Sequence, residues 1–579
     1  MNDNKNFVIA ILLSLVVLLG WSWAADRFFP SPKAPTTQTA PATTGAPAAV
    51  PTPGVAPAAT PPGPAAATAL KPRAAILAAS PRVMIDTPSL KGSINLKGAQ
   101  FDDLVMTGQR QDLTKDSKPV RLLSPIGAPN AYVANVGWSG DGAAVPGFDT
   151  LWTADRTSLT PGQPVTLTTQ MGDGLRYQLV VAVDDGYLFT VKQTVGNGSA
   201  KPVTVRPTGL ISRSSKSNDR SSWTTHVGPM SVFDGKADYG TDWKTLDEAG
   251  ANGQRASDVN GWLGFTDHFW LTALAPAGNT KMASDFRHSP TGGYQADYAL
   301  AASTLAPGQQ ATAETRLFAG AKEKKWLTAY ENQGIDKLSK AIDWGWFEWF
   351  MRPIFVLLLF LFKLTGNFGV AIIGLTLVVR LIMFPIAQKQ FASMAAMRKI
   401  QPMLKAVQER FKDDKQRQQQ EVLKLYQAEK INPAAGCLPI LIQIPVFYAL
   451  YKVLMVSVEM RHQPFVLWIK DLSAPDPLTP VNLFGLLDFS PPTFLAIGVL
   501  PILVGFTQWL SMKLNPQPMD PVQKQMFAIM PWLLVFMMAP FAAGLQLYWM
   551  TNNILTILQQ WWLYRRFGLN FSDTHPVEE

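Results

Sequence analysis

The stretch Phe368-Gly-Val-Ala-Ile-Ile-Gly-Leu-Thr-Leu-Val-Val-Arg380-Leu-Ile-Met-Phe-Pro-Ile386 places a permanent charge inside an apolar run. The run is about long enough for a helix that crosses a bilayer. A guanidinium stays protonated, and placing one in hydrocarbon costs roughly 2.5–3.5 kcal/mol on insertion scales. Two interpretations follow. Arg380 could face a hydrated cavity, or it could snorkel to the surface, because Ile386 is only about 9 Å of helix away.

Four more apolar runs follow the first, and together they predict a membrane core of five helices within residues 367–564. The five expected spans are residues 368–386, 437–458, 493–512, 526–541 and 544–562. Lys452 lies in the second of these runs, and there we expect the side chain to snorkel. Residues 344–366 begin with an aromatic cluster and hold a shorter apolar segment, which predicts an interfacial helix, with a full span as the weaker interpretation.

The N-terminal half of the chain has a different composition. Residues 1–29 contain an apolar run that predicts an uncleaved transmembrane anchor, although Ser22-Trp23-Ala24 leaves a cleaved signal peptide as the alternative. Residues 30–72 are rich in Pro, Ala and Thr and predict an extended tether. Residues 73–343 hold short alternating segments between turn signals, which predict a large all-β sandwich that ends in a helix.

The distribution of charge orients the chain in the membrane. Residues 388–430 carry ten Lys and Arg against five Asp and Glu, with apolar residues at helical spacing, whereas the loop 459–492 is net acidic. We therefore expect a cytoplasmic hairpin of two amphipathic helices over residues 388–431. The short tail 565–579 and the N-terminus should also be cytoplasmic, and the β domain extracytoplasmic. In this context the net charge of +9 indicates topology and not direct nucleic-acid recognition.

The five expected spans contain no Asp, Glu or His. An intramembrane protease or a proton-coupled pump needs such groups, so we expect no enzyme and no metal or other cofactor. The single cysteine, Cys437, has no nearby histidine to activate it and no intrachain partner for a disulfide. In the β domain, His226, His268 and His288 do not have the spacing of metal ligands.

The spans carry uncharged polar residues instead: Thr376, Gln443, Gln508, Gln546, Asn552, Asn553, Gln559 and Gln560. Thr376 lies one helical turn before Arg380 on the same face, so with Gln443 it could form a damp, positively charged recess. The alternative is ordinary hydrogen bonding between helices. Tyr548 and Trp549 could line this recess or only pack, and composition favours packing.

Many ordered motifs resemble the YidC/Oxa/Alb family of membrane protein insertases. They are Gly366-Asn-Phe-Gly369, Thr376-Leu-Val-Val-Arg380, Gln401-Pro402, Asn432-Pro-Ala-Ala-Gly-Cys-Leu-Pro439, Asp520-Pro-Val-Gln-Lys524, Gly544-Leu-Gln-Leu-Tyr-Trp549 and Thr551-Asn-Asn553. The anchor followed by an outer β domain is similar to the YidC form of the Gram-negative inner membrane. There the β domain resembles a supersandwich related to sugar mutarotases, with no established enzymatic role.

The resemblance implies a substrate groove open to the lipid and the cytoplasm. Its positive member matches Arg380, its polar partners match Thr376 and Gln443, and its aromatic position matches Trp549, next to Tyr548. Such a groove would receive the hydrophilic tail of a nascent membrane protein while the apolar segment moves into the lipid bilayer. The implied partners are the Sec translocase and the ribosome. Ribosome contact stays an open question, because the tail 565–579 ends with acidic residues.

Two other functions are compatible with the composition alone. A transporter could use Arg380 as a site for anionic solutes, and internal inverted repeats would favour that function, but we find none. A carbohydrate enzyme could use the membrane half as an anchor, although an anchor needs fewer than five spans. The substrates, the oligomeric state and a ligand of the β domain do not follow from the sequence.

Overall fold

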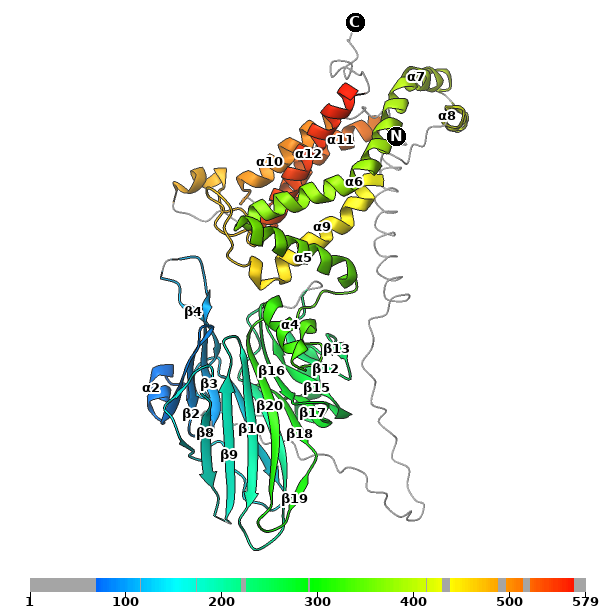
Figure 1. Cartoon of the computed structure of the whole chain (residues 1–579). Helices are drawn as coiled ribbons and strands as arrows, with labels where there is room; N and C mark the ends of the chain where they lie inside the picture. Colours follow the sequence, from blue (N-terminus) through cyan, green and yellow to red (C-terminus); the bar gives the residue numbers. More distant parts are fainter. Residues whose placement is uncertain are drawn as a thin grey trace, which may run out of the picture. The chain divides into compact units, whose positions relative to one another are not determined.

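The computed structural model describes residues 69–566, except residues 115, 173, 220–224, 290–291, 413, 430–437, 488–495 and 514–520. The expected anchor, nearly all of the tether and most of the C-terminal tail therefore lie outside the described residues. The chain forms two compact units (Figure 1). The first consists of Met1–Arg110 with Pro119–Ala341, and the second of Gln111–Lys118 with Ile342–Glu579.

The first unit is built from two large β-sheets. In the larger sheet the strands follow the order β14-β17-β18-β11-β5-β3-β2-β1-β7, with β19 beside β11 and β4 beside β3. In the other sheet the order is β13-β12-β15-β16-β20-β10-β9-β8-β6. The strand bounds are β1 (Arg82–Asp86), β2 (Leu90–Asn95), β3 (Gln100–Arg110), β4 (Pro119–Leu123), β5 (Tyr132–Gly140), β6 (Thr153–Ala154), β7 (Ser158–Leu159), β8 (Val165–Gln170), β9 (Leu175–Val183), β10 (Leu188–Asn197), β11 (Val203–Arg213), β12 (Gly228–Phe233), β13 (Lys236–Asp238), β14 (Gln254–Val259), β15 (Gly261–Thr266), β16 (Trp270–Pro276), β17 (Met282–His288), β18 (Tyr294–Leu300), β19 (Ser303–Leu305) and β20 (Gln310–Ala321).

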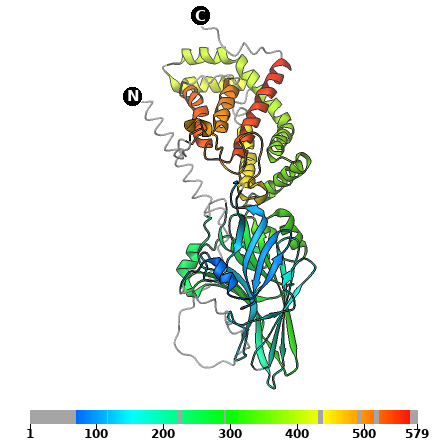
Figure 2. The same cartoon turned by 90° about the vertical axis from the view of Figure 1, so that its left-hand side faces the viewer.

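The two sheets pack face to face as a sandwich (Figure 2). Side chains alternate between the two faces of a strand, and in β9 every second residue from Leu175 to Val183 is buried. The ring of Phe101 on β3 meets the ring of Phe189 on β10 edge to face, with centroids 5.2 Å apart. The all-β sandwich expected from the alternating segments is therefore confirmed.

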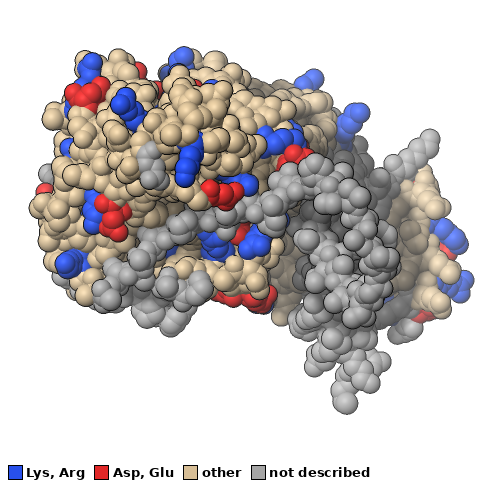
Figure 3. Space-filling view, turned by 90° about the horizontal axis from the view of Figure 1, so that it is seen from below, with Lys and Arg blue, Asp and Glu red and all other residues tan. Residues whose placement is uncertain are grey.

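Three helices accompany these sheets: α2 (Arg73–Ala78), α3 (Trp243–Ala249) and α4 (Lys324–Asn332). Helix α4 follows the last strand, where the sequence predicts a helix. Its residue Trp326 lies edge to face against Tyr187, and the backbone N–H of Tyr187 donates to the hydroxyl of Tyr330 at 2.8 Å. These contacts hold α4 against the sandwich. On the face of the molecule shown in Figure 3, the acidic and basic residues of the described part are interspersed.

The second unit is helical. Its helices are α5 (Glu348–Thr365), α6 (Phe368–Lys399), α7 (Gln401–Arg410), α8 (Lys415–Ala428), α9 (Leu438–Val456), α10 (Val499–Lys513), α11 (Pro521–Met538) and α12 (Ala543–Arg566). A helix occupies each of the five expected spans. Among the described residues, one segment, Phe368–Lys389, is long and apolar enough to cross a membrane by itself, and α9 and α11 contain shorter apolar stretches.

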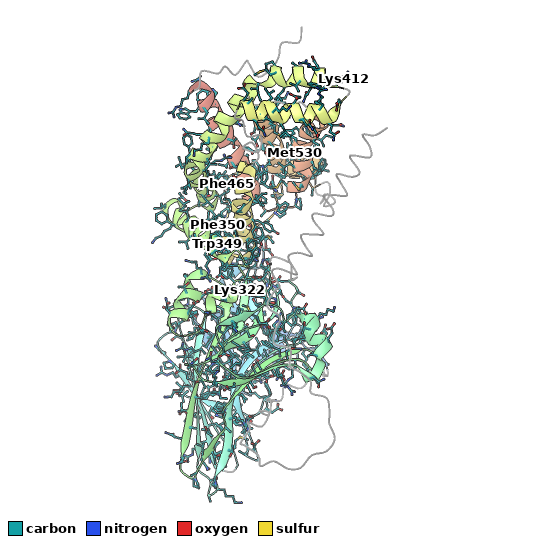
Figure 4. All side chains as sticks on the ribbon, turned by 90° about the vertical axis from the view of Figure 1, so that its right-hand side faces the viewer. Lys322, Trp349, Phe350, Lys412, Phe465 and Met530 are labelled. Carbon is teal, nitrogen blue, oxygen red and sulfur yellow. The ribbon has the colours of Figure 1, made fainter. Side chains whose placement is uncertain are left out.

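Helix α5 has one buried and one exposed apolar side. Met351, Phe355 and Leu358 are buried, whereas Trp349, Phe360 and Leu364 are exposed. Figure 4 labels Trp349 and Phe350 near the start of this helix. The exposed apolar side fits contact with lipid, and the interfacial orientation of residues 344–366 stays a prediction.

Helices α7 and α8 form a short hairpin beyond the end of α6. The side chain of Asp414 accepts a hydrogen bond from the Arg417 amide at 3.0 Å and so caps the start of α8. Ile400 and Leu404 are buried against an apolar set on α8, namely Val422, Leu425 and Tyr426. The apolar spacing of residues 388–430 produces this contact.

The connection from α9 to α10 crosses the ends of the other core helices. The side-chain amide of Asn367, just before α6, donates to the Phe465 carbonyl at 3.0 Å, and the Phe465 ring (labelled in Figure 4) covers Gly369. The amides of Ala543 and Gly544 donate to the carbonyls of Ala474 and Leu472 at 2.7 and 2.9 Å. This connection therefore covers the starts of α6 and α12.

A candidate polar site among the core helices

Arg380 projects from α6 toward α12. Its Nε donates to Asn552 Oδ1 at 2.8 Å, and its Nη2 donates to the Asn552 carbonyl at 3.1 Å and also to the hydroxyl of Thr556. The side chain is half-buried. All of these acceptors are neutral, so the described residues that bind the guanidinium orient its charge without compensating it.

One face of α12 carries the groups that meet α6 and α9. Tyr548, Asn552 and Thr556 are spaced four residues apart, so they lie above one another on the helix. Tyr548 is buried, and its hydroxyl accepts a hydrogen bond from the Gln443 side chain on α9. The row therefore joins Arg380 on one neighbouring helix to Gln443 on another.

The spacing of Thr376 suggests a contact with Arg380, but its hydrogen-bond partner lies in the opposite direction, one turn earlier in α6. Thr376 is buried one turn before Arg380, and its hydroxyl donates to the carbonyl of Ile372 on its own helix at 2.7 Å. A threonine inside a helix often satisfies its donor in this way. Its hydroxyl oxygen can still accept a hydrogen bond, so Thr376 contributes polarity beside the guanidinium.

The adjacent face of α12 is directed toward α10. Trp549 Nε1 donates to Gln508 Oε1 at 3.2 Å, and Asn553 Nδ2 donates to Thr507 Oγ1 at 3.2 Å. The Trp549 ring also meets Phe447 edge to face at 5.0 Å. Tyr548 and Trp549 are thus both packed between helices, which is the arrangement that composition favoured.

The sequence did not identify the groups that hold Arg380. In the sequence Asn552 is one of several polar residues of the spans, and nothing in its immediate neighbourhood or in that of Thr556 points to Arg380. The signal that could have found them is the four-residue spacing from Tyr548, because it places a hydroxyl, an amide and a second hydroxyl on one face of α12.

Lys452 differs from the expectation of a snorkelling side chain. It is 1% exposed on α9, and its Nζ lies 3.8 Å from a carboxylate oxygen of Asp343. The prediction was wrong because the segment before α5 brings a counter-charge to the lysine, so the side chain does not need to reach water.

Comparison with known proteins decides the family. A family model described as 60Kd inner membrane protein matches residues 360–570, and one described as YidC periplasmic domain matches residues 82–357. A relative from Zymomonas mobilis subsp. mobilis named membrane protein insertase YidC is 44% identical over 568 residues, which cover 98% of this chain and 96% of the relative. The chain belongs to the YidC family of membrane protein insertases.

The comparisons also include a second YidC relative and a solved structure. The relative from Methylorubrum extorquens, also named membrane protein insertase YidC, is 45% identical over 98% of this chain and 96% of its own length. A crystal structure titled as an active YidC insertase with its first transmembrane domain resolved covers 83% of this chain and 92% of its own, at 20% identity and a TM-score of 0.35.

Several predictions from the sequence are thereby confirmed. The chain is a helical inner-membrane protein with a large periplasmic β domain, as the YidC family models describe. The YidC family consists of insertases and not of enzymes, and the alternative of a transporter for anionic solutes is not favoured.

Proposed function

We propose that the core of this insertase uses Arg380 as an uncompensated charge that attracts the acidic, hydrophilic end of a nascent membrane protein. The observation that supports this role is the set of neutral acceptors on α12 that hold the guanidinium. An arginine paired with a carboxylate would lose most of its attraction for a third group. Here the charge stays available to a substrate.

The neighbouring polar groups would keep the site hydrated. Thr376, Gln443, Tyr548 and Trp549 supply hydroxyl, amide and indole groups on α6, α9 and α12, and together with Arg380 they form the proposed substrate groove. Partial burial strengthens the interaction of the guanidinium with another charge. Two unit charges 4 Å apart interact by about 4 kcal/mol at an effective dielectric constant of 20, but only by about 1 kcal/mol in bulk water. A hydrated, partly buried recess would therefore attract an acidic tail strongly enough to bind it and weakly enough to release it.

The apolar part of a substrate would leave along the exposed side of α6. Leu377, Leu381 and Ile382 flank Arg380 in the sequence, and all three are exposed. An apolar segment that follows its acidic tail into the site meets this surface at once. Because lipid tails are as apolar as leucine, the segment can exchange contact with α6 for contact with lipid at little cost.

The topology and the partners complete the proposal. We infer that both termini and the α7–α8 hairpin face the cytoplasm, where the hairpin would receive substrates, and that the connection over the starts of α6 and α12 closes the periplasmic end. The positive balance of residues 388–430 supports this orientation. The insertase would act alone or with the Sec translocase.

The test compares Arg380→Ala with Arg380→Lys in proteoliposomes, using two single-span substrates that differ only in an acidic or a neutral translocated tail. We expect Arg380→Ala to lower insertion of the acidic substrate about tenfold more than insertion of the neutral one, which corresponds to about 1.4 kcal/mol of lost attraction. Arg380→Lys should keep much of the preference. An equal loss for both substrates would contradict the charge-attraction mechanism.

Hydration of the site can be measured separately. Thr556→Cys in a Cys437→Ser background should react with a water-soluble, membrane-impermeant thiol reagent from the cytoplasmic side, because Thr556 contacts the Arg380 guanidinium. Leu381→Cys on the lipid-facing side of α6 serves as the matched control and should react much more slowly. If both positions are equally unreactive, the site is dry and the proposal fails.

A further inference from the structure

The connection between α9 and α10 contains an exposed apolar turn at residues 479–487. Its large side chains are directed outward, and their exposed fractions reach 53% for Phe484 and 83% for Leu486. Val481, Leu483 and Leu487 are exposed beside them. Residues 477–487 contain no charged side chain. The exposed side chains of this turn are thus uncharged and mainly apolar, and they belong to no site described above.

The turn is held in one conformation by its own hydrogen bonds. The Phe484 amide donates to the Thr479 carbonyl at 2.9 Å, and the Leu487 amide donates to the Asn482 carbonyl at 3.1 Å. Leu483 and Phe484 have φ of 51° and 60°, in the left-handed region that costs roughly 1–2 kcal/mol for each residue with a side chain. A flexible apolar segment would relax this strain and collapse inward. The turn instead presents its side chains away from the helices.

The start of the turn is attached to the start of α10. The Val499 amide donates to the Leu478 carbonyl at 3.0 Å, and the Asp476 carboxylate accepts from the Leu500 amide at 2.7 Å and from Trp468 Nε1 at 2.9 Å. The carbonyls of Ala474 and Leu472 likewise accept hydrogen bonds from the amides of Ala543 and Gly544 at the start of α12. The turn therefore begins at the end of the bundle where α6, α10 and α12 begin.

This position defines what can cover the turn. Helix α10 lies in one of the five expected spans of the membrane core, and its exposed residues Ile502 and Phe506 lie within its first two turns. Because the Leu478 carbonyl is bonded to Val499, the first residue of α10, the apolar turn begins at the level where that helix begins. A patch of this kind in water would favour aggregation, whereas the interface of a bilayer accepts aromatic and aliphatic side chains.

We propose that residues 479–487 form a lipid anchor that inserts Leu483, Phe484 and Leu486 into the membrane interface. Under the orientation proposed above this is the outer, periplasmic leaflet. Residues 472–478, which precede the anchor and are bonded to the starts of α10 and α12, would then be held in place over the ends of the helices. The partner is the bilayer itself and not a second protein.

The experiment uses the full-length protein with Leu486→Cys in a Cys437→Ser background, labelled with an environment-sensitive fluorophore and reconstituted into phosphatidylethanolamine–phosphatidylglycerol vesicles. Phe506→Cys on the exposed side of α10 is the positive control. Asn279→Cys, in an exposed turn of the β domain, is the negative control. Monodisperse elution and full insertase activity establish that each labelled variant is folded.

A blue-shifted emission at position 486, quenched by brominated phospholipids to a degree comparable with position 506 and not seen at position 279, is the expected result. Emission at position 486 that matches position 279 would overturn the proposal. Protection of position 486 that is insensitive to brominated lipid and appears only after addition of substrate or translocase would also overturn it, because the turn would then be a protein-binding surface.

Discussion

Two cations in the core helices, Arg380 and Lys452, have opposite surroundings. Lys452 is almost fully buried on α9 and lies 3.8 Å from the Asp343 carboxylate. Arg380 is half-buried on α6 and contacts an amide, a carbonyl and a hydroxyl of α12. A buried charge with a counter-ion contributes to the structure, whereas a charge held by neutral groups can still act on a third molecule.

The β domain follows the pattern of Lys452. Its buried carboxylates Asp102, Asp267 and Asp297 each form an ion pair with an arginine. The printed acceptors of Arg380 on α12, by contrast, are all neutral groups. This difference is the basis of the substrate-attracting role proposed for Arg380.

The largest effect is expected from breaking the pair of Lys452. Lys452→Met leaves Asp343 without this partner. Removal of one member of a fully buried pair costs roughly 3–5 kcal/mol, and because the Asp343 side chain is 20% exposed we expect about 3 kcal/mol, the lower end of that range. Thermal unfolding in detergent should show a large decrease in midpoint. The double variant Lys452→Met with Asp343→Asn should recover much of the loss, and Arg380→Met should destabilise less. If Lys452→Met unfolds at the wild-type temperature, the pair has no structural role.

Within the β domain, two carboxylates share one arginine, and this makes stability depend on pH. Asp285 and Asp297 face each other across β17 and β18, and Arg287 lies 3.5 and 3.1 Å from them. Burial raises the pKa of Asp297 to about 7, above its ordinary value of 3.8. The folded state therefore binds this proton more tightly, so the contribution to stability is full below the ordinary pKa and is lost as pH rises toward 7.

The corresponding prediction is that Asp297→Asn stabilises the domain near neutral pH by on the order of 1–2 kcal/mol, because Arg287 loses one partner but keeps Asp285, and that it gives no gain below pH ~4. Hydrogen exchange of the β17 and β18 amides in the full-length protein, followed against pH, measures the change. Asp86→Asn at an exposed position on β1 is the matched control and should leave the slope unaltered. A wild-type slope in Asp297→Asn would assign the pH dependence to another group.

Asn552→Asp converts the surroundings of Arg380 into those of Lys452. The new carboxylate would pair with the guanidinium and cancel its attraction for an acidic tail, so we expect about a tenfold loss of the preference for acidic substrates, or about 1.4 kcal/mol. Insertion of neutral substrates should change little. Asn553→Asp, one residue along on the face toward α10, is the control. Retention of the acidic preference in Asn552→Asp would show that the charge of Arg380 is not the attractive element.

The smallest effect concerns the neutral contacts between helices. Gln508→Leu removes the acceptor of Trp549 Nε1 and should lower stability by about 0.6 kcal/mol, the average for hydrogen bonds between membrane helices. Its unfolding midpoint should decrease far less than that of Lys452→Met. A decrease as large as that of Lys452→Met would mean that neutral pairs and ion pairs contribute equally to stability here. The contrast drawn between Lys452 and Arg380 would then not hold.

Much of the candidate site followed from local features of the sequence. The five spans, the hairpin and the prominence of Arg380 depend on the length of apolar runs and on charge, which are properties of each segment. The polar residues on α12 were visible too, but their partners were not. Thr376 bonds to its own helix, and Asn552 and Thr556 hold the arginine, because the rotation of α12 against α6 decides which groups meet.

The sequence by itself determined that a β domain and a helical membrane core share this chain and that a fixed positive charge lies inside the first core span. These properties depend on the periodicity and the hydrophobicity of neighbouring residues. Only the tertiary structure decided that Lys452 meets a carboxylate while Arg380 meets neutral groups. Asp343 and Asn552 are distant in sequence from the cations they serve, and only packing of the helices brings them within hydrogen-bond or ion-pair distance.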